Sequence, residues 1–308
     1  MIPSQAAAGL LLSALLLMPA AWGLDKAPRF HDPSTPIRQG DTWTVFSTGN
    51  GIITRYSPDL KTWVTGEPVF KDFPAWHREV VPNQKGHLWA PDVTRRGDRY
   101  LLYYSVSGWG KNTSAIGLAT SPTLDPKSPA YQWKDEGIIV RSNDKDPYNA
   151  IDPQLFADPD GSLWMVFGSF WTGIQLIELD PKTGLRHPTH QKIRQLAWHD
   201  SIEAPALLKH GRYYYLFVNW GLCCRGVNST YEIRVGRSRK WKAISRICID
   251  AGSVHRRTSP GSRAFSARDT SRAVCARCAG VAALACSTCW IRHAWCCCRR
   301  RATWRCSG

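Results

Sequence analysis

The sequence predicts an all-β fold of the β-propeller type, and two observations support this class. First, one plan recurs four times: a residue followed by proline, a turn containing glycine, an aromatic-rich strand and a second strand. Second, the aromatic-rich strands begin at Trp43, Tyr100, Leu163 and Tyr213, which are 57, 63 and 50 residues apart. This spacing is typical of blades that bury their faces against neighbours. A β-sandwich also has short strands at regular spacing, but it gives no reason for the same proline-flanked element to open every repeat.

The four repeats supply the expected strands in order. They open at Asp32-Pro33, Ala90-Pro91, Asp152-Pro153 and Ala204-Pro205. The aromatic-rich strands are expected at residues 43–47, 100–104, 163–167 and 213–217, and the strands that follow them at 53–57, 115–119, 174–178 and 231–235. Because the first strand of each propeller blade lines the central channel, the residues at the four openings are expected to converge on one axis.

Residues 1–23 have the pattern of a secretory signal peptide. Six leucines lie between Leu10 and Leu17, and the small-residue sequence 20–23 follows them. A buried N-terminal helix is the alternative, but no polar face interrupts the run, which is also too short to span a bilayer comfortably. No later segment resembles a transmembrane span. We therefore expect a secreted protein, extracellular or periplasmic, with no membrane partner.

The formal net charge of +16 is concentrated at the C-terminal end. Residues 241–308 carry 12 Arg and 1 Lys against 2 Asp, whereas the other 240 residues carry 27 basic and 22 acidic side chains. The body of the chain therefore has an ordinary surface charge, and we expect no nucleic-acid partner.

The composition of residues 241–308 indicates a shift of the reading frame near Lys240. This tail has no tyrosine, little strand or helix periodicity, and nine of the 11 cysteines. Its two CxxC pairs, 275–278 and 286–289, lie too close together for the usual zinc module. Translation of GC-rich DNA out of frame gives such a bias toward Arg, Ala, Cys and Ser. We therefore divide the chain into a signal peptide (1–23), a propeller domain of about four blades (24–240) and an aberrant tail (241–308).

Three repeats carry an acidic residue at their opening position or one residue before it, namely Asp32, Asp152 and Glu203. Convergence of three acids at one mouth of the channel brings like charges together, and no stability argument calls for it. Glycoside hydrolysis requires such a cluster of acids, because the reaction needs one protonated carboxyl group and one carboxylate that activates water. An Asp before Pro is commonly a turn residue, so the recurrence at one repeat position is what favours catalysis. Apolar neighbours of Glu203 favour its role as the protonated acid.

These segments resemble glycoside hydrolase family 43, and within it the endo-arabinanases. The matching segments run in family order at residues 31–34, 87–92, 112–121, 149–156, 168–174, 202–205, 223–226, 229–231 and 235–238. The resemblance implies a five-bladed propeller that cleaves internal α-1,5 bonds of arabinan with inversion. It implies that Asp32 is the general base, that Glu203 is the general acid, and that Asp152 orients Glu203 and tunes its pKa.

Five further residues are candidates for substrate binding, because flat rings stack on the C–H face of a furanose and its hydroxyl groups need polar partners. They are Trp89, Trp109, Asn149, Ser169 and Trp171. Each tryptophan can equally be explained as packing core of a blade. The aromatic stretch from Trp63 to Trp109 is expected to edge an open groove, which favours endo action on arabinan by a monomeric enzyme. The alternatives are an exo-acting arabinofuranosidase or xylosidase of the same fold, and an inactive or merely carbohydrate-binding fragment.

The resemblance also implies a structural calcium ion in the central channel and no cofactor for the chemistry. The family's channel histidine lies in a Gly-Pro-Gly-His type segment of the fifth blade, and this chain lacks that segment, since His255 and His293 lie in unrelated contexts. We therefore assign no metal ligand. Without its fifth blade the chain is expected to aggregate and to have little activity. Cys223 and Cys224 are expected to form either a vicinal disulfide or two buried thiols.

Overall fold

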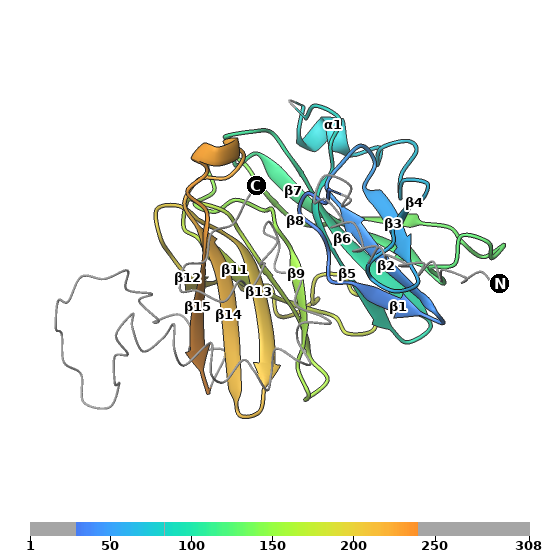
Figure 1. Cartoon of the computed structure of the whole chain (residues 1–308). Helices are drawn as coiled ribbons and strands as arrows, with labels where there is room; N and C mark the ends of the chain where they lie inside the picture. The colour runs from blue at the N-terminus through green and yellow to red at the C-terminus, as the bar shows by residue number, and fades with distance from the viewer. Residues whose placement is uncertain (1–28, 83, 240–308) are drawn as a thin grey trace, which may run out of the picture.

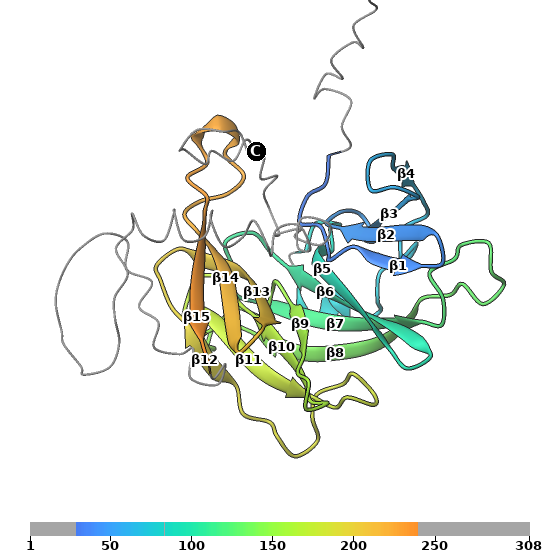
Figure 2. The same ribbon diagram turned by 60° about the horizontal axis from the view of Figure 1, so that its bottom comes forward.

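The structure is a computed structural model that describes residues 29–82 and 84–239. These residues form four antiparallel sheets that stand side by side in chain order, as the blades of an open β-propeller arc (Figures 1 and 2). The expected signal peptide (1–23) and tail (241–308) lie outside the described residues. Among the described residues, no helix has both the length and the apolar character needed to cross a bilayer.

The first two blades have four strands each, in chain order across the sheet. Blade 1 contains β1 (Ile37–Gln39), β2 (Thr42–Ser47), β3 (Ile53–Ser57) and β4 (Val64–Thr65), and the short helix α1 (His77–Val80) lies in the connection that follows. Blade 2 contains β5 (Trp89–Arg96), β6 (Arg99–Ser107), β7 (Ser114–Ser121) and β8 (Lys134–Ser142).

Blade 3 again has four strands, whereas blade 4 has three among the described residues. Blade 3 contains β9 (Gln154–Ala157), β10 (Leu163–Phe167), β11 (Ile174–Leu179) and β12 (Arg194–Ala197). Blade 4 contains β13 (Ile202–His210), β14 (Tyr213–Trp220) and β15 (Glu232–Ser238), and the 3₁₀ turn η2 (Gly226–Asn228) lies between its last two strands. All eight strands expected from the repeats are present, and β3 and β10 have the expected bounds.

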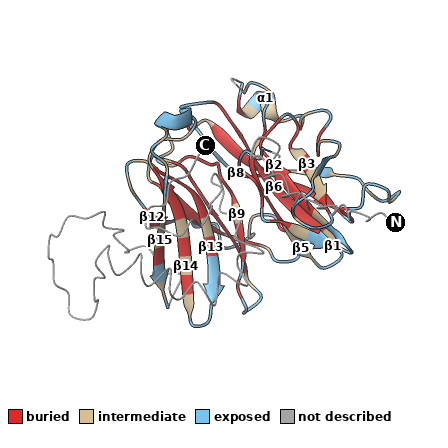
Figure 3. Ribbon diagram, in the orientation of Figure 1, coloured by how far each residue is buried: buried red, intermediate tan, exposed pale blue. Residues whose placement is uncertain are grey.

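Three apolar cores lie between successive blades. Because successive side chains of a strand point to opposite faces of the sheet, a central strand can contribute to the cores on both of its faces. In β6, Tyr100, Leu102 and Tyr104 pack toward blade 1, whereas Leu101 and Tyr103 pack toward blade 3. In β10 the side chains alternate in the same way: residues 163, 165 and 167 pack toward blade 2, and residues 164 and 166 pack toward blade 4. The central strands are consequently buried on both faces (Figure 3).

The residue before each opening proline has a left-handed backbone. The φ angles of Asp32, Ala90, Asp152 and Ala204 are +48°, +42°, +58° and +51°. Left-handed backbone costs a residue other than glycine about 1–2 kcal/mol, and a following proline normally favours extended backbone. The first regular strand of blades 1 and 3 therefore begins only after this residue. In blades 2 and 4 the residue lies inside β5 and β13, at the point where the pairing register shifts. Four recurrences of one strained conformation at the same end of the blades indicate a functional constraint.

Polar side chains two residues after the strained position bond the blades to one another. The carboxylate of Asp92 accepts the backbone N–H of Thr35 from blade 1 (3.3 Å) and that of Leu155 from blade 3 (2.9 Å). Gln154 Oε1 accepts the backbone N–H of Leu207 from blade 4 (2.9 Å). These bonds fix the inner strands of neighbouring blades, which contain Glu203 and follow Asp32 and Asp152.

The outer face of blade 4 is only partly covered. On β14 the side chains of Tyr213, Tyr215 and Phe217 point away from the core shared with blade 3 and are half-buried. Arg212 and Arg237 lie over the Tyr213 ring at 5.6 Å and 4.6 Å. Aromatic residues at alternate positions are typical of a face that packs against a further blade.

Candidate active site

Asp32 is fixed by a threonine that sequence reasoning overlooked. Its side chain is buried, and Thr48 Oγ1 donates to Asp32 Oδ2 at 2.6 Å. The same hydroxyl accepts the backbone N–H of Ala90 at 2.8 Å, so the contact joins the openings of blades 1 and 2. His31 Nε2 lies 3.6 Å from Asp32 Oδ2. Thr48 directly follows β2, and this position is the only feature of the sequence that could have identified it as a partner of Asp32.

Asp152 makes a bridge from blade 3 to the segment that carries Glu203. Its side chain is buried, and Oδ2 accepts the backbone N–H of Ala204 at 3.2 Å. Ser105 Oγ of blade 2 accepts the backbone N–H of Asp152 at 3.0 Å. Asp152 therefore holds the residue next to Glu203 in place, which is the arrangement that a positioning role requires.

Glu203 is buried and receives hydrogen bonds on both carboxylate oxygens. Ser169 Oγ donates to Oε2 at 2.7 Å, and the Tyr231 hydroxyl donates to Oε1. Ser169 comes from the β10–β11 connection of blade 3, and Tyr231 directly precedes β15 of blade 4. The expected substrate residue Ser169 thus contacts the candidate general acid, and Tyr231 is a second partner that sequence reasoning did not single out. Two partners from different blades fix the orientation of this carboxyl group.

The aromatic candidates of blade 2 lie together. The rings of Trp89 and Trp109 meet edge to face, with centroids 6.5 Å apart and planes at 70°. Trp89 is half-buried, whereas Trp109 is 74% exposed, which a blade core does not explain. An exposed indole beside the opening of blade 2 can stack on a sugar ring.

The other two candidates differ in accessibility. Asn149 is buried, and its side-chain oxygen accepts a hydrogen bond from Ser114 Oγ at 2.7 Å. Trp171 is 41% exposed and follows Ser169 by two residues. Trp171 is therefore available to a ligand, whereas the buried Asn149 joins the segment before β9 to β7 of blade 2.

Cys223 and Cys224 lie in the β14–β15 connection at the end of blade 4 that carries η2 (Figure 1). They are free thiols whose Sγ atoms lie 2.7 Å apart. Hydrogen bonds donated to its thiolate by Cys223 and His31 lower the pKa of Cys224 to about 5. The Cys223 pKa is raised because its thiol pairs with Cys224, is half-buried and lies near the charges of Glu203 and Asp32. This connection therefore brings blade 4 to His31 and Asp32 of blade 1.

Gly221 allows the connection to close on itself. Its φ is +91°, and a Cβ atom at this position would lie 2.3 Å from the Thr230 carbonyl oxygen. Leu222 and Thr230 exchange hydrogen bonds across the base of the loop at 3.0 Å each. The closed base places Tyr231 against Glu203.

The described residues do not bring a metal-ligand set together at this mouth. They contain one group of three close ligating side chains, Glu178, His187 and His190, and it lies at the opposite end of blade 3. The ligating atoms of this group lie within 4.8 Å of one another, but two of the three side chains offer imidazole nitrogens, whereas calcium takes oxygen ligands. Within residues 29–82 and 84–239, the side chains at the mouth therefore do not offer a ligand set that fits the calcium ion implied by the family resemblance.

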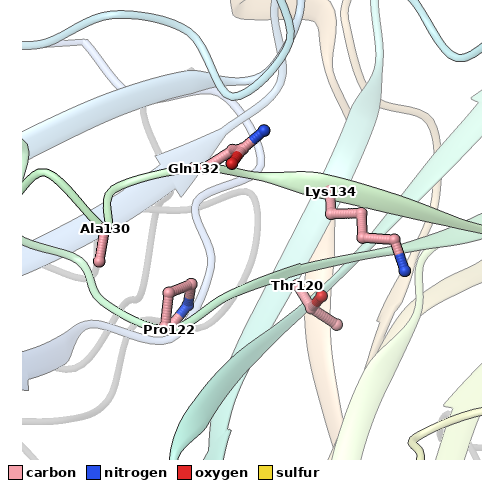
Figure 4. A pocket seen from close by; sticks show the side chains of 5 residues that line it. All are labelled: Thr120, Pro122, Ala130, Gln132 and Lys134. Carbon is pink, nitrogen blue, oxygen red and sulfur yellow. The ribbon is translucent and has the colours of Figure 1, made fainter.

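A hollow of about 260 Å³ lies on blade 2 (Figure 4), and none of the three acids lines it. It is lined by Thr120, Pro122, Ala130, Gln132 and Lys134. Lys134 is paired with Glu136 at 2.9 Å, and the lining offers no acid that could act on a sugar. The candidate active site is therefore the mouth that carries Asp32, Asp152 and Glu203.

Propeller blades that carry three buried acids at one mouth define the class of protein as a glycosidase. Residues 27–244 match the family described as "Glycosyl hydrolases family 43". The chain belongs to this family and is a glycoside hydrolase. The match ends four residues after Lys240.

The curated relatives are named as enzymes that act on arabinan-type linkages. The chain is 45% identical to the extracellular exo-α-(1→5)-L-arabinofuranosidase ArbA of Cellvibrio japonicus, covering 74% of this chain and 70% of the relative. It is 42% identical to the extracellular endo-α-(1→5)-L-arabinanase 1 of Bacillus subtilis, covering 76% and 72%.

A solved structure shows the same fold. The α-L-arabinanase of Cellvibrio cellulosa is 44% identical, with a TM-score of 0.65 over 68% of this chain and 71% of that chain. The all-β propeller class expected from the sequence is therefore confirmed for the four blades that the structure describes.

Proposed function

We propose that this protein is an endo-acting arabinanase, which hydrolyses internal α-1,5-L-arabinofuranosidic bonds of arabinan with inversion. The observation that carries the proposal is the hydrogen-bonded placement of three buried acids at one mouth, in a family whose curated relatives include an endo-arabinanase. The relative at 45% identity is named as exo-acting, so the mode of attack needs its own test.

In the proposed reaction, Asp32 is the general base. Thr48 donates to Oδ2 of Asp32 and fixes this carboxylate, which accepts a proton from the attacking water. An inverting enzyme needs room for that water between base and sugar, which sets a carboxyl separation of roughly 6.5–9.5 Å.

Glu203 is the general acid that protonates the leaving glycosidic oxygen. Ser169 and Tyr231 hold its two oxygens, and Asp152 holds the adjacent Ala204 N–H. A protonated Glu203 has one O–H, which donates to the substrate oxygen, and its remaining acceptor capacity is available to these hydroxyl donors. Fixed partners limit the positioning error of the acid, and an error of about 1 Å costs roughly 10²-fold in rate.

The remaining proposals concern the whole chain. The named relatives are described as extracellular, which supports secretion directed by residues 1–23. We propose a monomer that acts on the polysaccharide directly, without nucleic-acid or membrane partners. We also propose that the native enzyme has a fifth blade, encoded in another frame after Lys240, and the frame-corrected protein is called the restored form.

The size of the first products tests the endo assignment. Linear 1,5-arabinan digested by the restored form is expected to give oligosaccharides of several residues before arabinose accumulates, because an open groove binds the chain in its interior. Chromatography of samples taken before a few per cent of bonds are cleaved measures this distribution. Arabinose as the sole product from the first samples would show exo action instead.

A further inference from the structure

We propose that Trp198, together with Trp171, forms a platform that binds arabinose residues of arabinan distal to the cleavage point. This inference rests on the proposed function and adds a binding element to it. Trp198 is 60% exposed and Trp171 is 41% exposed. Trp171 lies in the β10–β11 connection of blade 3, and Trp198 lies in the β12–β13 connection that leads to blade 4. Trp198 Nε1 donates to the Trp171 carbonyl oxygen at 2.9 Å, so the two residues form one unit.

The platform adjoins the candidate general acid. Phe170 N–H donates to the Ile202 carbonyl oxygen at 2.7 Å, one residue before Glu203. Ser169, two residues before Trp171, bonds Glu203 directly. Trp198 itself precedes Glu203 by five residues. A sugar chain held at Glu203 therefore passes beside both indoles.

The two connections are built to approach each other closely. Gly173 has a φ of +75°, and a Cβ atom there would lie 2.3 Å from the Ala197 carbonyl oxygen and 3.0 Å from Trp198 Cα. Gln195 Nε2 also donates to the Thr172 carbonyl oxygen at 2.7 Å. Trp198 is thus held against the Trp171 connection by contacts that leave its ring exposed.

Backbone strain at Trp171 indicates function rather than packing. Phe170 and Trp171 are consecutive left-handed residues, with φ of +51° and +42°. Such conformations are unfavourable for aromatic residues and persist mainly at functional positions. The residue that follows Trp198 is also held in place, because the ring of His199 stacks on Trp220 with centroids 3.8 Å apart and planes at 8°. The backbone at one of the two exposed indoles is thus strained, and the residue next to the other is held by ring stacking.

The chemistry of the platform fits a neutral sugar chain. Indoles present flat apolar faces to C–H groups, and an exposed apolar pair beside an active site is a typical ligand surface. Because the platform lies within blade 3 and its junction with blade 4, it does not depend on how blades 1 and 4 meet. It can therefore be tested by binding to the chain as it exists.

The experiment uses the monomeric fraction of the full chain, separated from aggregate by size-exclusion chromatography. Calorimetry measures the binding of α-1,5-arabinobiose and arabinohexaose, with Glu203→Gln in every variant to prevent hydrolysis. Trp198→Ala is expected to weaken hexaose binding roughly 3- to 10-fold and to leave biose binding unchanged, because only the longer chain reaches the platform. Trp198→Phe keeps a stacking ring and is expected to retain most of the affinity.

Leu208→Ala is the matched control, since Leu208 is an exposed apolar residue at the opposite end of β13 and should change neither affinity. Equal binding of hexaose by the parent and by Trp198→Ala would overturn the platform, as would an equal loss for biose and hexaose. Failure of the parent to bind either sugar would instead overturn the proposed function, and the platform with it.

Discussion

Replacing Glu203 by glutamine in the restored form is expected to lower arabinan hydrolysis by about 10²–10⁴-fold. Glutamine keeps the shape of the side chain, and its amide oxygen can accept from one of Ser169 and Tyr231 while its NH2 group donates to the other hydroxyl, but it cannot protonate the leaving oxygen. Asp32→Asn is expected to have a similar effect, because the amide cannot take the proton from water. Initial rates and calorimetric affinity for arabinohexaose, measured in parallel, separate lost chemistry from lost binding.

Glu232→Gln provides the matched control for Glu203→Gln. Glu232 is an exposed residue of blade 4 whose carboxylate bonds Arg234 on the same strand, and its substitution should leave the rate unchanged. A Glu203→Gln variant with more than about a tenth of the parent rate would remove Glu203 from the acid role, since that loss is below the range for general acid catalysis.

The second large effect concerns the fifth blade. The full chain, with its own residues 241–308, is expected to aggregate and to hydrolyse arabinan at least about 10²-fold more slowly than the restored form. Tyr213, Tyr215 and Phe217 give blade 4 a half-buried aromatic face, and a further blade would cover it. Ring closure also sets the separation of Asp32 in blade 1 from Glu203 in blade 4. Size-exclusion chromatography, thermal melting and initial rates compare the two proteins.

The control is the restored form with residues 241–308 of the present chain fused after its fifth blade, which separates loss of the blade from harm done by the tail. If the full chain proves monomeric, melts cooperatively and matches the restored form in rate, then the four described blades suffice for activity. In that case the proposal of a frame shift, or of the need for ring closure, is wrong.

The repeat predicted the blades well because its signals are local. Aromatic-rich strands between glycine turns mark β2, β6, β10 and β14, and the inter-blade packing follows from the two-residue period. The expectation that each opening element is itself a strand was less accurate. Asp32 and Asp152 lie just before the first strand of their blades, because the left-handed conformation that aims them into the mouth interrupts the ladder.

The partners of the acids were harder to predict because they come from distant parts of the chain. Thr48 reaches Asp32 from the end of β2, Tyr231 reaches Glu203 across the β14–β15 connection, and Asp152 reaches Ala204 across 52 residues. Serine, threonine and tyrosine are common throughout the sequence, so no local pattern separates these from others. Trp198 was missed for a related reason, since it stands outside the proline-flanked openings.

The anomeric configuration of the first product tests the assignment of base and acid together. Proton NMR spectra recorded during the first minutes of arabinan hydrolysis by the restored form are expected to show new reducing ends in the β configuration, opposite to the α bond that is cleaved, before mutarotation mixes the anomers. Inversion follows if Asp32 activates water on the face opposite the leaving oxygen that Glu203 protonates. New reducing ends in the α configuration would mean that a carboxylate attacks the sugar directly, and Asp32 as general base and Glu203 as general acid of an inverting reaction would both be wrong.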